Sequence, residues 1–247
     1  MILGRIAHAI RHQNWSQIIV EVLIVIVGIF LGLQVQNWYE DKADRQAEKT
    51  YLNRMHTEAS DVIEQARLFN EARGKILKNL HTLSDLLIAD AEIAEFTNNH
   101  CASLALSHVY ANRTVQLPTV SELTSSGGLE LIENGNVRNA MAKYSIGLQL
   151  SSGILSSLKD GLTDFSHDYP EVVELQKYTI NSDIEGQRVK CDFQAMKDTP
   201  AIKNIVLNST TRYFFFVKYI TGQFDILMEL HNAVDAALKF SHEEPKI

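Results

Sequence analysis

Clustered positive charge is missing from this chain of 247 residues, and its absence excludes one large class of function. The 23 lysines and arginines are scattered, and 30 aspartates and glutamates outnumber them, which leaves a formal net charge of −7 at pH 7. A nucleic-acid surface needs a patch or stripe of basic side chains that contacts phosphates. We therefore expect no nucleic-acid partner.

Linker sequence and catalytic motifs are missing as well. The chain has four prolines and no Ser/Gly-rich tract that would divide it. It contains no G-x-S-x-G turn, zincin helix, phosphate-binding glycine loop or dinucleotide fingerprint. A serine hydrolase built on Ser125 or Ser126, with His167 and Asp168, is a remote alternative, because serines and glycines more often end a helix. We expect no catalytic residue, no cofactor and no enzymatic activity.

Cysteine is limited to Cys101 and Cys191. In an oxidising compartment the two could form a disulfide, and two buried thiols are the equal alternative. His100, Cys101 and His108 do not predict a metal site, because the two histidines are eight residues apart and cannot share one ion without another element. We expect no metal.

One long apolar run is present, from Ile18 to Val35, and the only two tryptophans, Trp15 and Trp38, flank it. Eighteen helical residues span about 27 Å, close to the hydrocarbon thickness of a bilayer, and tryptophan favours the headgroup level. The run lacks the small-residue cleavage site of a signal peptide and the polar face of a soluble core helix. These features predict a transmembrane helix over residues 18–38, with both tryptophans as membrane-interface anchors.

Charge beside the apolar run sets the expected orientation. Residues 1–17 carry Arg5 and Arg11 and no acidic residue, and short basic flanks stay in the cytoplasm. We therefore expect residues 1–17 to form a cytoplasmic or interfacial segment and residues 39–247 to form a periplasmic helical-bundle domain.

Two details inside the run bear on its partners. Gly28 and Gly32 form a small-xxx-small pair, which lets a second helix approach closely, although glycine is also common in membrane helices. We assign them to transmembrane packing. Glu21 is the only ionisable residue in the run, and a carboxylate at membrane depth can mark a partner or a proton path. It is near enough to Trp15 for its carboxylate to reach the headgroups, which is the simpler interpretation.

Three apolar seams with steps of three and four residues predict three long helices. They run from Leu52 to Leu87, from Val137 to Phe165 and from Ile202 to Leu238. No helix breaker separates Trp38 from Leu52. The expected fold is therefore all-α, with one N-terminal transmembrane helix that continues into an extramembrane bundle of three to four long helices.

Shorter elements are expected between and within these helices. The sequence predicts a weaker helix from Phe96 to Val109 and a short strand near Tyr178 to Ile184. Thr199 and Pro200 have the pattern of an N-cap followed by the first helical residue. The aromatic run Tyr213 to Phe216 suits core packing, with an interface or a pocket as the alternative.

The turn-rich stretch from Leu117 to Gly135 is the least bundle-like part of the chain. Thr119 and Glu122 have capping-box spacing, which predicts a short helix that starts at Thr119 and stops at Gly127. Asn136 is expected to cap the following long helix. We expect a recognition surface here, with a candidate partner surface of Glu122, Ser125, Ser126, Gly127 and Arg138.

The sequence resembles a known family at several of these places. The resemblance is carried by Gln13-Asn14-Trp15, the apolar span, Asn37-Trp38-Tyr39-Glu40 and the later Glu122-Leu123-Thr124-Ser125-Ser126-Gly127. It is to an uncharacterised family of bacterial single-span inner-membrane proteins. The resemblance implies an inner-membrane location and brings no activity or catalytic residues.

These patterns together predict a class of function. We expect a membrane-anchored, non-enzymatic accessory or assembly subunit whose partners are the lipid bilayer and another membrane or periplasmic protein, or a second copy of itself. A periplasmic ligand-sensing domain that signals through a partner is the alternative.

Overall fold

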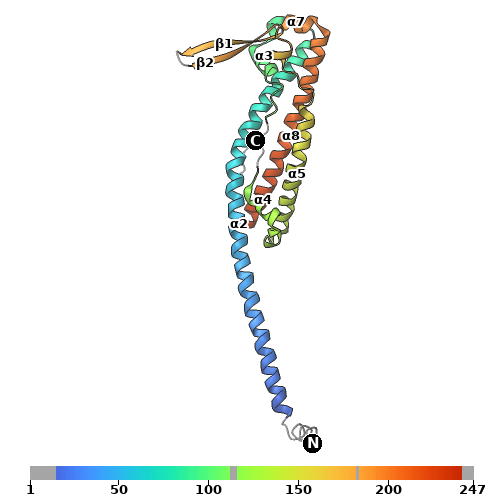
Figure 1. Ribbon diagram of the computed structural model, residues 1–247. Coiled ribbons are helices and arrows are strands. Elements are labelled where there is room, and N and C mark those ends of the chain that lie inside the picture. The colour runs from blue at the N-terminus through green and yellow to red at the C-terminus, as the bar shows by residue number, and fades with distance from the viewer. Residues whose placement is uncertain (1–14, 112–115, 182–183, 241–247) are drawn as a thin grey trace. The chain divides into compact units, whose positions relative to one another are not determined.

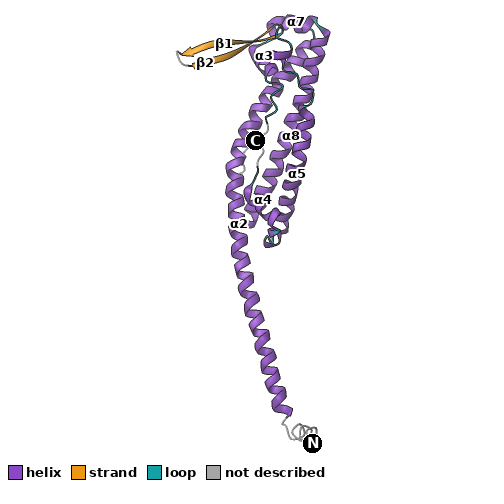
Figure 2. Cartoon of the chain, viewed as in Figure 1, coloured by secondary structure: helices purple, strands orange, loops and turns teal. Residues whose placement is uncertain are grey.

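The computed structural model describes residues 15–111, 116–181 and 184–240, and most of them are helical (Figure 2). The all-α prediction is confirmed, with one two-stranded sheet as the exception. The chain divides into two compact units, Met1–Thr50 and Tyr51–Ile247. Residues 1–14, which make up most of the predicted cytoplasmic segment, lie outside the described residues.

The first unit contains a helix long and apolar enough to cross a membrane. This is the beginning of α2, which spans Trp15–Ile88. Thirteen large apolar side chains between Ile19 and Val35 are each more than half exposed. Trp38 is also exposed, with Lys42 Nζ 5.6 Å from the centre of its ring. Trp15 is the first residue of α2, and its side chain lies outside the described part.

The second unit is built on three long helices, as the apolar seams predict. The remainder of α2 is joined by α5, Gly135–Lys159, and α8, Pro200–Leu238. Helices α5 and α8 lie side by side (Figure 1), and Lys143 of α5 pairs with Glu229 of α8. Gly147 permits this closeness, because a Cβ atom there would lie 3.2 Å from Cδ1 of Ile226.

The remaining elements of the second unit are short. The helices are η1 (Ile93–Glu95), α3 (Asn98–Ala105), α4 (Pro118–Ser126), η2 (Gly128–Leu131), α6 (Phe165–Asp168) and α7 (Phe193–Asp198). Strands β1 (Val173–Asn181) and β2 (Ile184–Cys191) form an antiparallel hairpin in which Val173 pairs with Cys191. The hairpin is more extensive than the single short strand predicted near Tyr178.

The interior of the second unit contains two separate hydrophobic clusters. The hairpin-end core gathers residues such as Leu80, Leu83, Leu87, Phe165, Val173 and Phe216. The α4-end core gathers residues such as Leu52, Met55, Leu123, Met141, Leu230 and Val234. Between them, Val62, Ala66 and Phe69 of α2 are only half-buried. The first seam is therefore fully buried at its two ends and partly open in its middle.

Two predicted helix caps are wrong and two are confirmed. Helix α4 has Leu117 rather than Thr119 as its N-cap. Helix α5 is capped by Asn134 rather than Asn136, because the Asn134 side chain accepts hydrogen bonds from the second and third backbone amides of that helix. Gly127 ends α4 in the left-handed region at φ 76°, and Thr199 and Pro200 begin α8 as predicted.

A disulfide joins Cys101 of α3 to Cys191 at the end of β2, with Cα atoms 5.6 Å apart. An isolated two-stranded hairpin is barely stable in water, and this bond fixes its base to a helix. Cys101 consequently offers no thiolate to a metal, and Nδ1 of His100 accepts a hydrogen bond from the Thr97 amide at 3.2 Å.

We predict that replacing both cysteines by serine lowers the free energy of unfolding by about 2 to 4 kcal/mol, because the bond closes a long loop in the unfolded chain. Guanidinium unfolding of the wild-type and double-serine proteins measures the loss. A thiol assay provides the check on pairing, since two reactive thiols in the unreduced, unfolded wild-type chain would contradict the disulfide.

A second prediction concerns pH. Burial lowers the pKa of His100, so the folded chain binds this proton less readily than the unfolded chain does. Stability should therefore fall as the pH drops below about 6.5, the ordinary histidine pKa. His100→Gln keeps an acceptor for the Thr97 amide but has no proton to gain in this pH range. It should therefore reduce the loss of stability at low pH. His81→Gln, at an exposed position, should leave the pH dependence of thermal unfolding unchanged.

Candidate partner surface at α4

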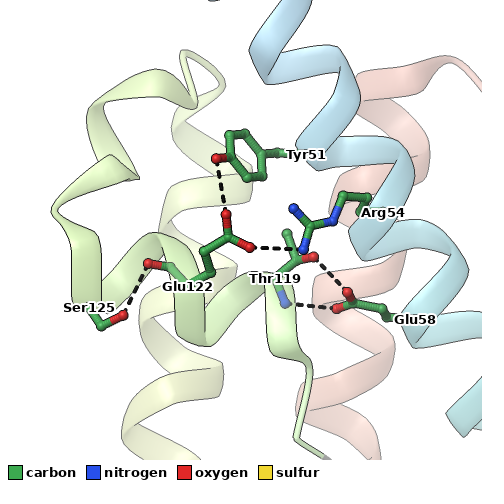
Figure 3. Close-up of polar contacts among 6 residues, drawn as sticks. All are labelled: Tyr51, Arg54, Glu58, Thr119, Glu122 and Ser125. Atoms are coloured by element: carbon green, nitrogen blue, oxygen red, sulfur yellow. Dashed lines mark hydrogen bonds and ion pairs between the residues drawn. The ribbon is translucent and has the colours of Figure 1, made fainter.

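Helix α4 is attached to α2 by a carboxylate that binds its first turn. The backbone amide and the hydroxyl of Thr119 donate to the two carboxylate oxygens of Glu58, at 3.0 and 2.6 Å (Figure 3). Thr119 is fully buried, and its amide belongs to the first turn of α4, where amides lack partners within the helix. Glu58 therefore caps α4 from a neighbouring helix, where negative charge also suits the helix dipole.

A second attachment lies one turn further along α4. Glu122 accepts hydrogen bonds from Nη2 of Arg54 at 2.8 Å and from the hydroxyl of Tyr51 at 3.2 Å (Figure 3). The hydrogen bond from Arg54 lowers the pKa of Glu122 and raises the pKa of Arg54. Both side chains are close to half exposed, so this ion pair guides the position of α4 more than it stabilises the fold.

The loop after α4 is fixed by Arg138. Its Nη1 atom donates to the backbone carbonyl oxygens of Ile132 and Glu133, at 2.5 and 3.0 Å. Two members of the predicted partner surface, Glu122 and Arg138, are thus engaged within the chain. Their contacts hold α4 and its following loop in place.

The other three predicted residues form an exposed turn at the end of α4. Ser125 donates to the carbonyl oxygen of Glu122 at 3.2 Å, and the hydroxyl of Ser126 accepts from the Gly128 amide at 3.3 Å. Gly127 sits between them in the left-handed conformation. All of these bonds are local, so the outer surface of the turn is the part of the predicted surface that remains accessible.

The structure does not assemble a serine hydrolase at this turn. His167 and Asp168 pair with each other on α6, with Nδ1 and Oδ1 2.9 Å apart. Helix α6 contacts α3 and β1, whereas α4 contacts α5 and η2. The histidine and aspartate therefore belong to the hairpin end of the unit, away from Ser125 and Ser126.

The structure also shows an exposed apolar stripe on α5. Ile146, Leu150 and Ile154 are 56, 61 and 45% exposed, and their spacing of four places them on one face of the helix. That spacing is readable in the sequence beside the buried seam of the same helix. On α8 the aromatic run is divided: Tyr213 and Phe216 are buried, and Phe214 and Phe215 are exposed.

Comparisons with known proteins matched nothing. No family model, no curated protein and no solved structure matches this chain. The resemblance to bacterial single-span inner-membrane proteins stays a prediction, and the function has to be argued from the chain's own geometry.

The attachment of α4 gives a stability prediction. Glu58→Ala should lower the free energy of unfolding by about 2 to 3 kcal/mol, because it leaves the buried amide and hydroxyl of Thr119 without their charged acceptor. Asp61→Ala, at an exposed position one turn away, is the matched control and should change stability little. Equal effects in urea unfolding would contradict a capping role for Glu58.

Proposed function

We propose that this protein is a non-enzymatic, single-span protein of the bacterial inner membrane that binds a protein partner as an accessory or assembly subunit. One observation carries the proposal, namely the exposed apolar surface of α2 between Ile19 and Val35. A contiguous apolar surface of this kind marks contact with a membrane or with another protein.

The energetics favour a lipid environment for this segment. Each leucine, isoleucine, valine or phenylalanine near the centre of a spanning helix contributes about 0.3 to 0.6 kcal/mol to insertion. The thirteen large apolar side chains together contribute about 4 to 8 kcal/mol on that scale. One acidic residue at the centre would oppose insertion by about 2.5 to 3.5 kcal/mol, and Glu21 is near the end of the run, where the cost is smaller.

Open space around the glycines of the segment supports a helical partner. Gly28 lies on the same exposed helix face as four large apolar side chains, those of Val20, Leu23, Ile24 and Leu31. A Cβ atom added at Gly28 or Gly32 would meet nothing within 4 Å. Packing of small residues, rather than hydrophobicity, drives helix association in lipid. We therefore propose that a second spanning helix packs against Gly28 and Gly32.

Chemistry elsewhere in the chain supports the proposed orientation. Disulfides persist in oxidising compartments such as the bacterial periplasm, and the unit beginning at Tyr51 contains the Cys101–Cys191 bond. The purely basic flank before the span favours the cytoplasm. We propose that the N-terminus is cytoplasmic and that the disulfide-bonded domain is periplasmic.

Ligand sensing is the second candidate function, because a cavity of about 440 Å³ lies at the base of the hairpin. Pro170, Val172, Lys190, Asp192 and Phe193 are among the residues that line it. Its volume falls within the range of about 300 to 1,000 Å³ that is usual for small-molecule sites, and its lining mixes charged and apolar groups.

The test of partner binding is the native mass of the full chain, purified in mild detergent from its own membranes. We expect a mass above the 27.9 kDa of one chain, from a second copy or from a co-purifying protein. Gly28→Leu with Gly32→Leu should reduce that mass toward the monomer, because the larger side chains prevent close approach of a second helix.

The matched control changes side chains of α2 on a different face from Gly28 and Gly32. Ile26→Leu with Ile29→Leu preserves side-chain volume and should leave the native mass unchanged. A wild-type chain that runs as a monomer, with no co-purifying protein, would overturn the partner-binding proposal and favour ligand sensing at the hairpin cavity.

A further inference from the structure

A second polar cluster links α2 to α8 beside the α4-end core. It contains His56 of α2 with His231 and Asp235 of α8. Oδ1 of Asp235 lies 2.7 Å from Nδ1 of His56, and its Oδ2 lies 3.2 Å from Nδ1 of His231. The three side chains are only 18, 11 and 12% exposed. A single carboxylate is therefore shared by two mostly buried imidazoles.

Helix geometry and packing fix the three groups. His231 and Asp235 are four residues apart, which places them on one face of α8. His56 follows Met55, a fully buried member of the α4-end core, so its position on α2 is set by that packing. Its ring stacks on the His231 ring with centroids 5.2 Å apart, and Phe240 covers it edge-on at 5.0 Å.

Ser60 borders this cluster and contacts one of its imidazoles. Its hydroxyl donates to the carbonyl oxygen of His56 at 2.8 Å, and the same oxygen atom lies 3.1 Å from Nε2 of His231. A hydroxyl has one proton, and a carbonyl oxygen can only accept. With the hydroxyl proton directed at that carbonyl oxygen, Nε2 of His231 is the donor to Ser60. In that tautomer Nδ1 of His231 faces the Asp235 carboxylate, 3.2 Å away, with a lone pair that a bound cation can accept.

We propose that His56, His231 and Asp235 bind a zinc ion. Two imidazoles and a carboxylate form a ligand set that zinc uses, with a fourth position left for water. The three ligand atoms lie within 4.8 Å of one another, and the edges of a tetrahedral zinc site are about 3.3 Å long for bonds of about 2.0 Å. Small side-chain rotations therefore bring the ligands into place.

The contact with Ser60 matches this assignment. A metal-bound histidine donates its other ring N–H to a neighbouring acceptor, which fixes its tautomer and its orientation. Nε2 of His231 has such an acceptor in the Ser60 hydroxyl. In the tautomer described above, Ser60 donates to the His56 carbonyl oxygen, whereas a nucleophilic serine has to donate its proton to the histidine.

The proposed ion would connect the first and last long helices of the bundle. Its ligands come from α2 and α8, so zinc would act as a cross-link between them in addition to the hydrophobic contacts of the α4-end core. The site is independent of the proposed partner binding and of the span.

The test uses the full chain in mild detergent, purified with a histidine-free tag and stripped of metal with a chelator. We expect calorimetry to show one zinc ion bound per chain. Cobalt bound at the same site should give a visible absorption spectrum that disappears when zinc is added. Zinc at about 100-fold above its dissociation constant should raise the Tm by about 5 to 10 °C.

Variants separate the site from adventitious binding. His231→Ala and His56→Ala should each weaken zinc binding more than about 100-fold, and Ser60→Ala by about 10-fold. His167→Ala, which removes an exposed histidine at 85% exposure, should bind zinc like the wild type. If circular dichroism shows an alanine variant to be unfolded, Asp235→Asn is used in its place. This variant keeps the side-chain shape and should also weaken zinc binding. A wild-type chain that takes up no zinc, or ligand variants that bind it as tightly as wild type, would overturn the proposal.

Discussion

Apolar surface that the chain leaves uncovered is the constraint on which the rest of this structure depends. The first unit contributes a helix whose large apolar side chains between Ile19 and Val35 find no cover within the described chain. Water makes that arrangement unfavourable, so a bilayer or a partner helix has to supply the cover. The second unit covers its own apolar side chains, because its apolar seams pack against one another and form two buried cores. One chain thus combines a helix with uncovered apolar side chains and a unit with buried cores.

Polar contacts and the disulfide add to the apolar packing in positioning the short elements of the second unit. Hydrophobic burial brings α2, α5 and α8 together and seats the short α4 on them through Val120 and Leu123. Glu58 and Arg54 add directional contacts by binding successive turns of α4 through Thr119 and Glu122. At the other end the disulfide performs the same task for the hairpin. Both short elements are thus held by directional bonds in addition to their apolar contacts.

Periodicity made the long helices predictable, because a seam with steps of three and four residues has few other meanings. The caps were less predictable. Thr119 has the right spacing to Glu122, yet its hydroxyl is taken by Glu58, 61 positions away in sequence. The polar cluster beside α8 was missed for a similar reason. His231 and Asp235 are visibly one turn apart, but the approach of His56 depends on how α2 and α8 align, and that alignment is set by packing that no local pattern records.

The separation of the two cores has a consequence for the motions of the second unit. The middle of α2 around Val62 and Phe69 is only half-buried, so on this helix the packing between the two cores is weaker than at either end. Elements with their own core can open as separate cooperative units. The hairpin, α3 and α7 can therefore open transiently while α4 and the neighbouring ends of α5 and α8 stay folded. Amide protons at the two ends would then exchange with solvent at different rates, and an event at one end would reach the other mainly through the long helices themselves.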